Sequence, residues 1–194
     1  MKNRFDLVLR LSIALIFGAM LSSARASNAS VEPDEIWLQL NPTEQRLEVM
    51  LGEHPVVYYK NVAWGSGGIG LKQRQGDEVT PVGSFRVRWI NRDSKYRLFF
   101  GFDYPNPSYA NQGLRSGALT PQQHNKIVRA WEREQIPPQT TAIGGSLGIH
   151  GLGRANPEVH AVANWTNGCI ALNNTQIEHL AGLISVGTRV VITQ

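Results

Sequence analysis

The chain has 194 residues, enough for one domain of ordinary size and a short appendage. Hydrophobic residues make up 42% of it and charged residues 18%, which is typical of a folded globular domain and excludes a disordered chain. The formal net charge of +4 comes mostly from the first 26 residues, and the densest basic cluster beyond them is Lys72–Arg74. Because a nucleic-acid partner needs a concentrated basic face, the sequence predicts no such partner.

Residues 1–26 have the pattern of a signal peptide, with a basic start, an apolar run from Leu11 to Leu21 and small residues before a cleavage site after Ala26. The apolar run of about eleven residues is shorter than the roughly twenty that span a bilayer. We therefore predict export to the periplasm, cleavage and no stable membrane insertion afterwards. A retained anchor is the alternative that this pattern leaves open. The mature part carries 15 basic and 14 acidic side chains, a net charge of +1.

An antiparallel meander is predicted at the start of the mature part. The segment 36–51, IWLQLNPTEQRLEVML, alternates apolar and polar residues on both sides of Asn41–Glu44, which predicts a β-hairpin. The turn residues Gly52–Pro55 lead into residues 56–64, whose Val and Tyr content predicts a third strand. Residues 27–35, before this meander, are predicted to be a linker.

The middle of the chain combines strands with loops. Residues 65–70 are rich in glycine, but they lack the Lys-Ser/Thr ending of a phosphate-binding loop and no helical pattern follows, so we interpret them as a flexible loop. A strand is predicted over residues 84–90, and residues 95–103 are expected to extend the sheet. Residues 104–117 are rich in Pro, Asn and Gly, which predicts a loop.

Two helices are predicted in the second half. Thr120 is a suitable N-cap and Gln123 occupies the capping-box position, which predicts a helix over residues 120–135. Asn173 is fit to cap a second helix over residues 175–184.

The remaining elements are short. Residues 142–150 are a candidate strand, residues 159–165 a short apolar segment, and residues 188–193 a last strand of β-branched residues. Strands outnumber helices throughout the chain. The sequence therefore predicts a mainly β fold, a sheet or sandwich with one or two short helices.

The densest chemistry lies between Ile149 and Leu172. Cys169 is the only cysteine, so an internal disulfide is excluded, and the thiol is buried and inert, bridged to another chain, or chemically used. A free thiol with a pKa of about 8.5 is mostly protonated at neutral pH, so a nucleophilic cysteine needs a neighbouring imidazole. His150, nineteen positions upstream, is the candidate base, and a carboxylate or a backbone carbonyl would orient its ring.

Glycines accompany both residues. Gly168 lets the backbone turn sharply before Cys169 and lets a substrate approach closely. The backbone N–H of Cys169, aided by that of Gly168, is a candidate oxyanion hole. On spacing alone, catalysis and the packing of a buried cysteine remain equally open.

The other histidines give no second site. His160 is another candidate base, but its position in an apolar run favours a structural role. His54 is predicted in a turn and His124 and His179 on helices, and no pair of histidines has the close spacing of a zinc motif. The sequence therefore predicts no metal site and no cofactor.

Two motifs in order resemble one known family. The second half of the chain has the pattern HG, about fifteen residues and then T-x-G-C-I, followed by Asn and a final GTRVVI strand. This pattern resembles the L,D-transpeptidase catalytic domain, also called the YkuD domain. Upstream, GDEVTPVGSF resembles the TP-x-G-x-F segment of the same family. The resemblance covers residues 36–194, nearly all of the mature chain.

The resemblance implies an L,D-transpeptidase-like β-sandwich that acts on peptidoglycan, with roles in wall biogenesis and cell shape. Cys169 would attack the amide between an L-centred diamino acid and a terminal D-residue of a stem peptide and become an acyl-enzyme, which an amine acceptor then releases. His150 would be the base and the Gly151 carbonyl its orienting group. Thr166, Asn167 and Gly168 would shape the turn that bears the thiol.

The sequence departs from the family pattern at two positions. Asn167 stands where many members have His, and Ala171 where many have Arg, which removes a charge able to pair with a substrate carboxylate. These departures support an alternative, an L,D-carboxypeptidase or amide hydrolase with water as acceptor. A second alternative is a non-catalytic wall-binding module, which would not need both Cys169 and His150. The sequence leaves the donor and acceptor peptides and the oligomeric state open.

Overall fold

The computed structural model of the chain describes residues 31–194. The predicted signal peptide, residues 1–26, and residues 27–30 of the predicted linker lie outside the described residues. Across residues 31–194, no helix combines the length and the apolar character needed to cross a membrane.

Strands dominate the fold. In chain order they are β1 (Ile36–Asn41), β2 (Arg46–Leu51), β3 (His54–Lys60), β4 (Ile69–Gly70), β5 (Thr80–Pro81), β6 (Gly83–Ser94), β7 (Arg97–Phe102), β8 (Gly148–His150), β9 (Ile170–Ala171) and β10 (Arg189–Ile192). Eight of them form one mixed sheet in the order β3-β2-β1-β10-β6-β7-β8-β9, and β4 and β5 form a separate parallel pair. The predicted mainly β fold class is confirmed.

The first three strands form the predicted antiparallel meander. Leu38 and Leu40 of β1 lie opposite Val49 and Leu47 of β2, and all four side chains are buried on one face. This is the alternation that a half-buried strand requires, because successive side chains point to opposite faces. The hairpin pattern in the sequence therefore places one apolar face toward the core.

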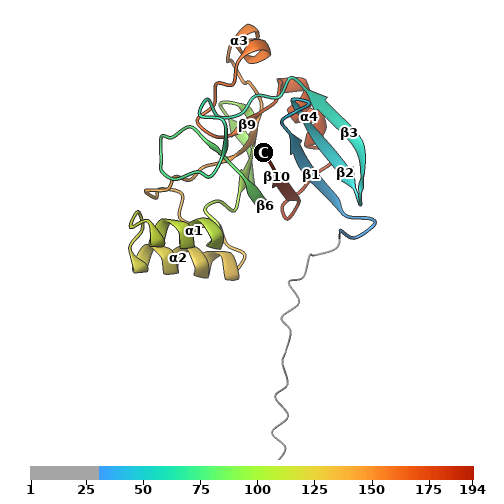
Figure 1. The fold of residues 1–194 in the computed structure, drawn as a ribbon. Coiled ribbons are helices and arrows are strands. Elements are labelled where there is room, and N and C mark those ends of the chain that lie inside the picture. Colours follow the sequence, from blue (N-terminus) through green and yellow to red (C-terminus); the bar gives the residue numbers. More distant parts are fainter. Residues whose placement is uncertain (1–30) are drawn as a thin grey trace, which may run out of the picture. The chain divides into compact units, whose positions relative to one another are not determined.

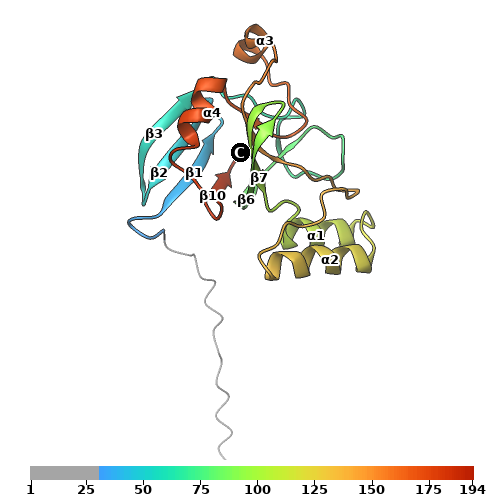
Figure 2. The same ribbon diagram turned by 180° about the vertical axis from the view of Figure 1, so that it is seen from behind.

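β6 is the strand that the two arms of the sheet share. Its first residues, 83–86, pair with β10, and from Val87 onward it pairs with β7. β10 pairs in parallel with β1, so the meander is joined to β6 through this last strand. Figures 1 and 2 show the blue meander and the green strands as two arms on either side of β10.

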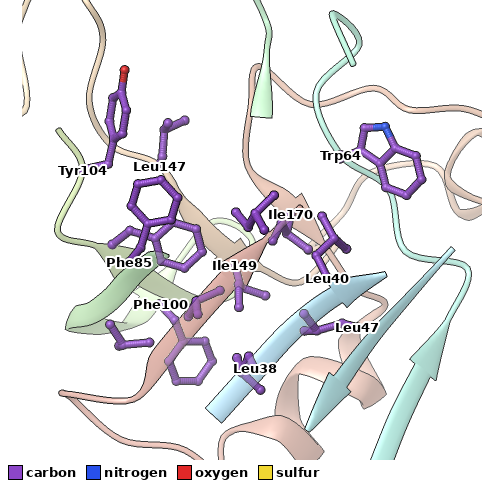
Figure 3. Close-up of a cluster of buried hydrophobic side chains, with 14 of the residues drawn as sticks. Leu38, Leu40, Leu47, Trp64, Phe85, Phe100, Tyr104, Leu147, Ile149 and Ile170 are labelled. Atoms are coloured by element: carbon purple, nitrogen blue, oxygen red, sulfur yellow. The ribbon is translucent and has the colours of Figure 1, made fainter. Parts of the chain in front are cut away.

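The hydrophobic core fills the space between the two arms, with leucines of the meander lying opposite side chains of β7, β8 and β9 (Figure 3). Burying a side chain of this size contributes about 1.5–3 kcal/mol. The fully buried facing residues are Leu38, Leu40, Leu47, Phe100, Ile149 and Ile170. β8 and β9, which carry the candidate site, are thus anchored by the core itself.

Four helices accompany the sheet, α1 (Pro107–Arg115), α2 (Pro121–Glu132), α3 (Pro157–Val162) and α4 (Asn174–Leu180). The two predicted helices are present as α2 and α4, and both end before their predicted C-termini. The Thr120–Gln123 capping box is formed, and Asn173 caps α4 as expected.

α1 corrects the loop predicted over residues 104–117. Asn106 is its N-cap, with a side chain that accepts from the Tyr109 N–H at 3.1 Å, and Pro107 opens the helix. Gly113 lies inside the helix, where a Cβ would come within 2.9 Å of Leu119. The residues that resemble a loop in the sequence therefore serve as cap and close contact.

Two further differences concern short elements. α3 lies in the segment predicted only as a short apolar stretch, and with α1 it brings the described residues to four helices where one or two were expected. The candidate strand over residues 142–150 is paired only at β8.

We expect Leu40→Ala to lower the free energy of unfolding by about 2–5 kcal/mol, because a fully buried leucine leaves a cavity between the two arms. Val56→Ala on β3 is the matched control, since Val56 is 52% exposed, and its effect should stay below about 1 kcal/mol. Urea unfolding measures both variants. Equal losses would contradict the assignment of the core to this face of the meander.

Candidate active site

The parallel pairing of β8 with β9 brings the two predicted catalytic residues to one face. Ile149 pairs with Ile170, so His150 ends β8 while Cys169 comes directly before β9. Because side chains alternate along strands, His150 and Cys169 point away from the face that buries both isoleucines. Both line one cavity of about 710 Å³.

The His150 ring is fixed by a hydrogen bond and by aromatic neighbours. Nδ1 lies 2.7 Å from the Gly151 carbonyl oxygen, which can only accept, so Nδ1 carries the proton and Nε2 remains an acceptor. The ring stacks on Tyr96 with centroids 4.3 Å apart, and Trp165 meets it edge-on at 5.9 Å. Burial lowers the pKa of His150, against the hydrogen bond to Gly151, so the imidazole is neutral at pH 7.

The Cys169 side chain is partly buried and lines the cavity. Its Sγ donates to the Ser146 carbonyl oxygen at 3.5 Å. Burial raises the pKa of Cys169 to about 11, while the backbone of Gly148 and the charge of Lys72 act in the opposite direction. Thiol and imidazole are therefore both uncharged at neutral pH.

The turn before Cys169 is held by the Thr166 hydroxyl. This oxygen donates to the Cys169 carbonyl at 2.6 Å and accepts from the Gly168 N–H at 3.2 Å. The Gly168 N–H, expected to aid an oxyanion hole, is thus already engaged. The Cys169 N–H makes no hydrogen bond within residues 31–194 and stays available for that role.

Gly168 is required at its position for two reasons. Its φ is +120°, a region that residues with a side chain rarely adopt. A Cβ there would also come within 2.7 Å of the Val79 carbonyl oxygen. The segment before β5 therefore packs directly behind the turn that bears the thiol.

The upstream TP-x-G-x-F motif reaches this turn through Thr80. The buried Thr80 hydroxyl accepts from the Gly65 N–H at 2.9 Å and donates to the Gly168 carbonyl at 3.0 Å. The Ser66 N–H donates to the Thr166 carbonyl at 2.9 Å. The glycine-rich segment interpreted as a flexible loop is therefore tied to both motifs.

Aromatic side chains form much of the cavity wall, and the sequence did not predict them. A register shift in β6 between Val87 and Trp89 changes which positions face the core. The Trp89 indole crosses Gly101, where a Cβ would lie 2.1 Å from the ring. A bulge has no sequence signal of its own, although a glycine within a strand is a hint of close approach. The aromatic lining residues are Trp89, Tyr96, Phe99 and Trp165.

The remaining predicted residues lie at different depths. Asn167 is exposed and lines the cavity, whereas Ala171 is fully buried and exchanges backbone hydrogen bonds with Ala63. His160 is buried in α3, does not line this cavity, and accepts from the Trp165 indole at 3.2 Å, a structural contact. In the described part of the chain, no group of three metal-ligating side chains is arranged to hold an ion.

Comparison with known proteins gives a family and a fold. The family model described as the L,D-transpeptidase catalytic domain, YkuD, matches residues 35–192. Sequence comparison with curated proteins gives no match.

Solved structures share the fold at low sequence identity. Bd1075 from Bdellovibrio bacteriovorus is 18% identical with a TM-score of 0.51, over 82% of this chain and 48% of that one. The helical cell shape determining protein Pgp2 from Campylobacter jejuni is 22% identical with a TM-score of 0.55, over 88% of this chain and 52% of that one. The chain thus spans about half the length of these two proteins.

Thr80→Val should lower the free energy of unfolding by about 2–4 kcal/mol, because it leaves both the Gly65 N–H and the Gly168 carbonyl buried without a partner. Thr80→Ser keeps the hydroxyl and should retain most of the stability. Guanidinium unfolding of the two variants gives the comparison. If valine and serine are tolerated equally, the hydroxyl bridge does not hold the turn.

Proposed function

Because the chain belongs to the L,D-transpeptidase catalytic domain family, we propose that it is an exported peptidoglycan L,D-transpeptidase that carries its acyl intermediate on Cys169. The observation that carries the proposal is that His150 at the end of β8 and Cys169 directly before the adjacent strand β9 line one cavity. The cavity of about 710 Å³ is large enough for several residues of a peptide. Periplasmic localisation is part of the proposal and follows from the signal-peptide pattern of residues 1–26.

In the first half of the reaction, the Cys169 sulfur attacks the carbonyl carbon of the stem-peptide amide. His150 Nε2 takes the thiol proton as the S–C bond forms, which suits a pair that is neutral at rest. The Gly151 carbonyl keeps the Nδ1 proton in place and stabilises the imidazolium. The Cys169 N–H donates to the oxyanion of the tetrahedral intermediate.

In the second half, His150 returns its proton to the departing amino group of the terminal D-residue, and a thioester remains on Cys169. An acceptor amine then loses a proton to His150 and attacks the thioester. The product is a new amide, and the thiol is restored.

Water is the alternative acceptor, which would make the protein an L,D-carboxypeptidase or amide hydrolase. Ala171 supports this alternative, because it is fully buried and places no charge where many family members have Arg. Asn167, exposed at the cavity, replaces the His of many members.

We expect residues 27–194 to convert tetrapeptide muropeptides into exchanged or cross-linked products, and Cys169→Ala to reduce conversion by about 10³-fold or more. Mass spectrometry of the muropeptide products measures conversion by the wild type and by Cys169→Ala. Mass spectrometry of the intact protein detects the acyl adduct. Cys169→Ala should unfold at nearly the wild-type temperature, which separates chemistry from folding. Unchanged conversion in that variant overturns the proposal, and binding without an adduct in the wild type would indicate a wall-binding module.

The acceptor is identified by the same reaction in heavy-oxygen water with a labelled D-amino acid present. Transfer yields a tetrapeptide that carries the labelled residue and no heavy oxygen. Hydrolysis yields a tripeptide with heavy oxygen in its new carboxylate, together with free D-alanine. We expect the labelled tetrapeptide to predominate. If the tripeptide with heavy oxygen is the only product, the protein is an L,D-carboxypeptidase.

A further inference from the structure

Lys72 is a buried lysine in the wall of the Cys169 cavity. It is 2% exposed and lines the cavity, and its Nζ is bonded to the Asp77 carboxylate. A lysine is almost never this buried unless its charge is paired. The reaction proposed above does not use it.

The partner carboxylate is held in its charged form. Asp77 Oδ2 accepts from the Gln73 N–H at 2.8 Å and the Arg74 N–H at 3.0 Å, and Oδ1 accepts from the Val79 N–H at 3.1 Å. Burial works against the charge, but the bond from Lys72 and these three N–H groups outweigh it and lower the pKa of Asp77. The pair is therefore a fixed ammonium and carboxylate.

Lys72 and the thiol line the same cavity and contact the same short segment of the chain. The Lys72 stem packs on Gly144, where a Cβ would come within 2.9 Å of Lys72 Cε. Two residues further on, the Ser146 carbonyl contacts the Cys169 Sγ. Lys72 and the thiol thus flank the same short segment, 144–146.

The other charged groups around the cavity are less suited to act on the sulfur. Lys95 is exposed and lies over the Tyr96 ring, and Asp93 is exposed. Glu78 is bound to Ser66 Oγ. His150 is the neutral proton acceptor, so Lys72 is the buried cation of this wall.

We propose that Lys72, positioned by Asp77, electrostatically stabilises the thiolate of Cys169 as its proton passes to His150. Lys72 forms no bond to the substrate in this step and exchanges no proton. The inference rests on the proposed role of Cys169 as nucleophile and deepens it. It is supported by the effect of the Lys72 charge, which opposes the rise in the pKa of Cys169 that burial produces.

Alkylation of Cys169 by iodoacetamide tests the inference, because the chain has one cysteine and thiolate is the form that reacts. Below its pKa of about 11, the wild-type rate should rise about tenfold for each pH unit, with no plateau at neutral pH. Lys72→Met keeps the apolar stem and removes the charge, so its profile should move to higher pH, with rates about three- to tenfold lower at pH 8.

Asp77→Asn should shift the pH dependence of alkylation in the direction opposite to Lys72→Met. The amide oxygen can still accept from the backbone, but the charge that neutralises Lys72 is gone. Its profile should move to lower pH, with rates about three- to tenfold higher at pH 8. Lys72→Arg keeps the positive charge and should restore most of the wild-type profile.

A purely structural role of the Lys72–Asp77 ion pair predicts a different outcome. Both Lys72→Met and Asp77→Asn break this pair, so both would change the alkylation rate of Cys169 in the same direction. That result, or two unshifted profiles, overturns the inference. Thermal unfolding of each variant confirms that the fold is intact before the comparison is made. Alkylation needs no turnover, so opposite shifts together with no muropeptide conversion would refute the proposed function, while the effect of the Lys72 charge on the Cys169 thiolate would still be established.

Discussion

The register of one parallel strand pair determines which side chains face the candidate site. Pairing Ile149 with Ile170 buries both isoleucines and turns His150 and Cys169 to the other face. A slip by one residue would exchange the two sets of side chains, because the side-chain period of a strand is two. The core between the two arms of the sheet therefore stabilises the fold and also fixes the relation between thiol and imidazole.

A second constraint connects segments that are far apart in the chain. Thr80 and Gly168 are 88 positions apart, and one hydroxyl joins them. Since Gly168 has a positive φ and no room for a Cβ, a residue with a side chain does not fit at this position. The two sequence motifs are thus parts of one structural unit, which accounts for their joint presence.

Much of this arrangement was predictable from the sequence. The hairpin over residues 36–51 and the capping box at Thr120 depend on local rules, and both were predicted correctly. α1 was missed because Asn106 and Pro107 have the same signature in a loop as at a helix start. The place of Trp89 in the cavity wall depends on a bulge in β6. The burial of the Lys72–Asp77 pair depends on residues outside its own segment, so local sequence patterns predict neither feature.

The raised pKa of Cys169 has a consequence for how long the free thiol survives. Disulfide exchange and oxidation to sulfenic acid both proceed through the thiolate. A thiol that stays protonated at rest is therefore slow to be consumed by small oxidants, even in an oxidising compartment where an unpaired cysteine is a liability. If Cys169 is the nucleophile proposed above, its thiolate forms only when His150 Nε2 takes the proton, and the free thiol stays in the form that small oxidants attack slowly.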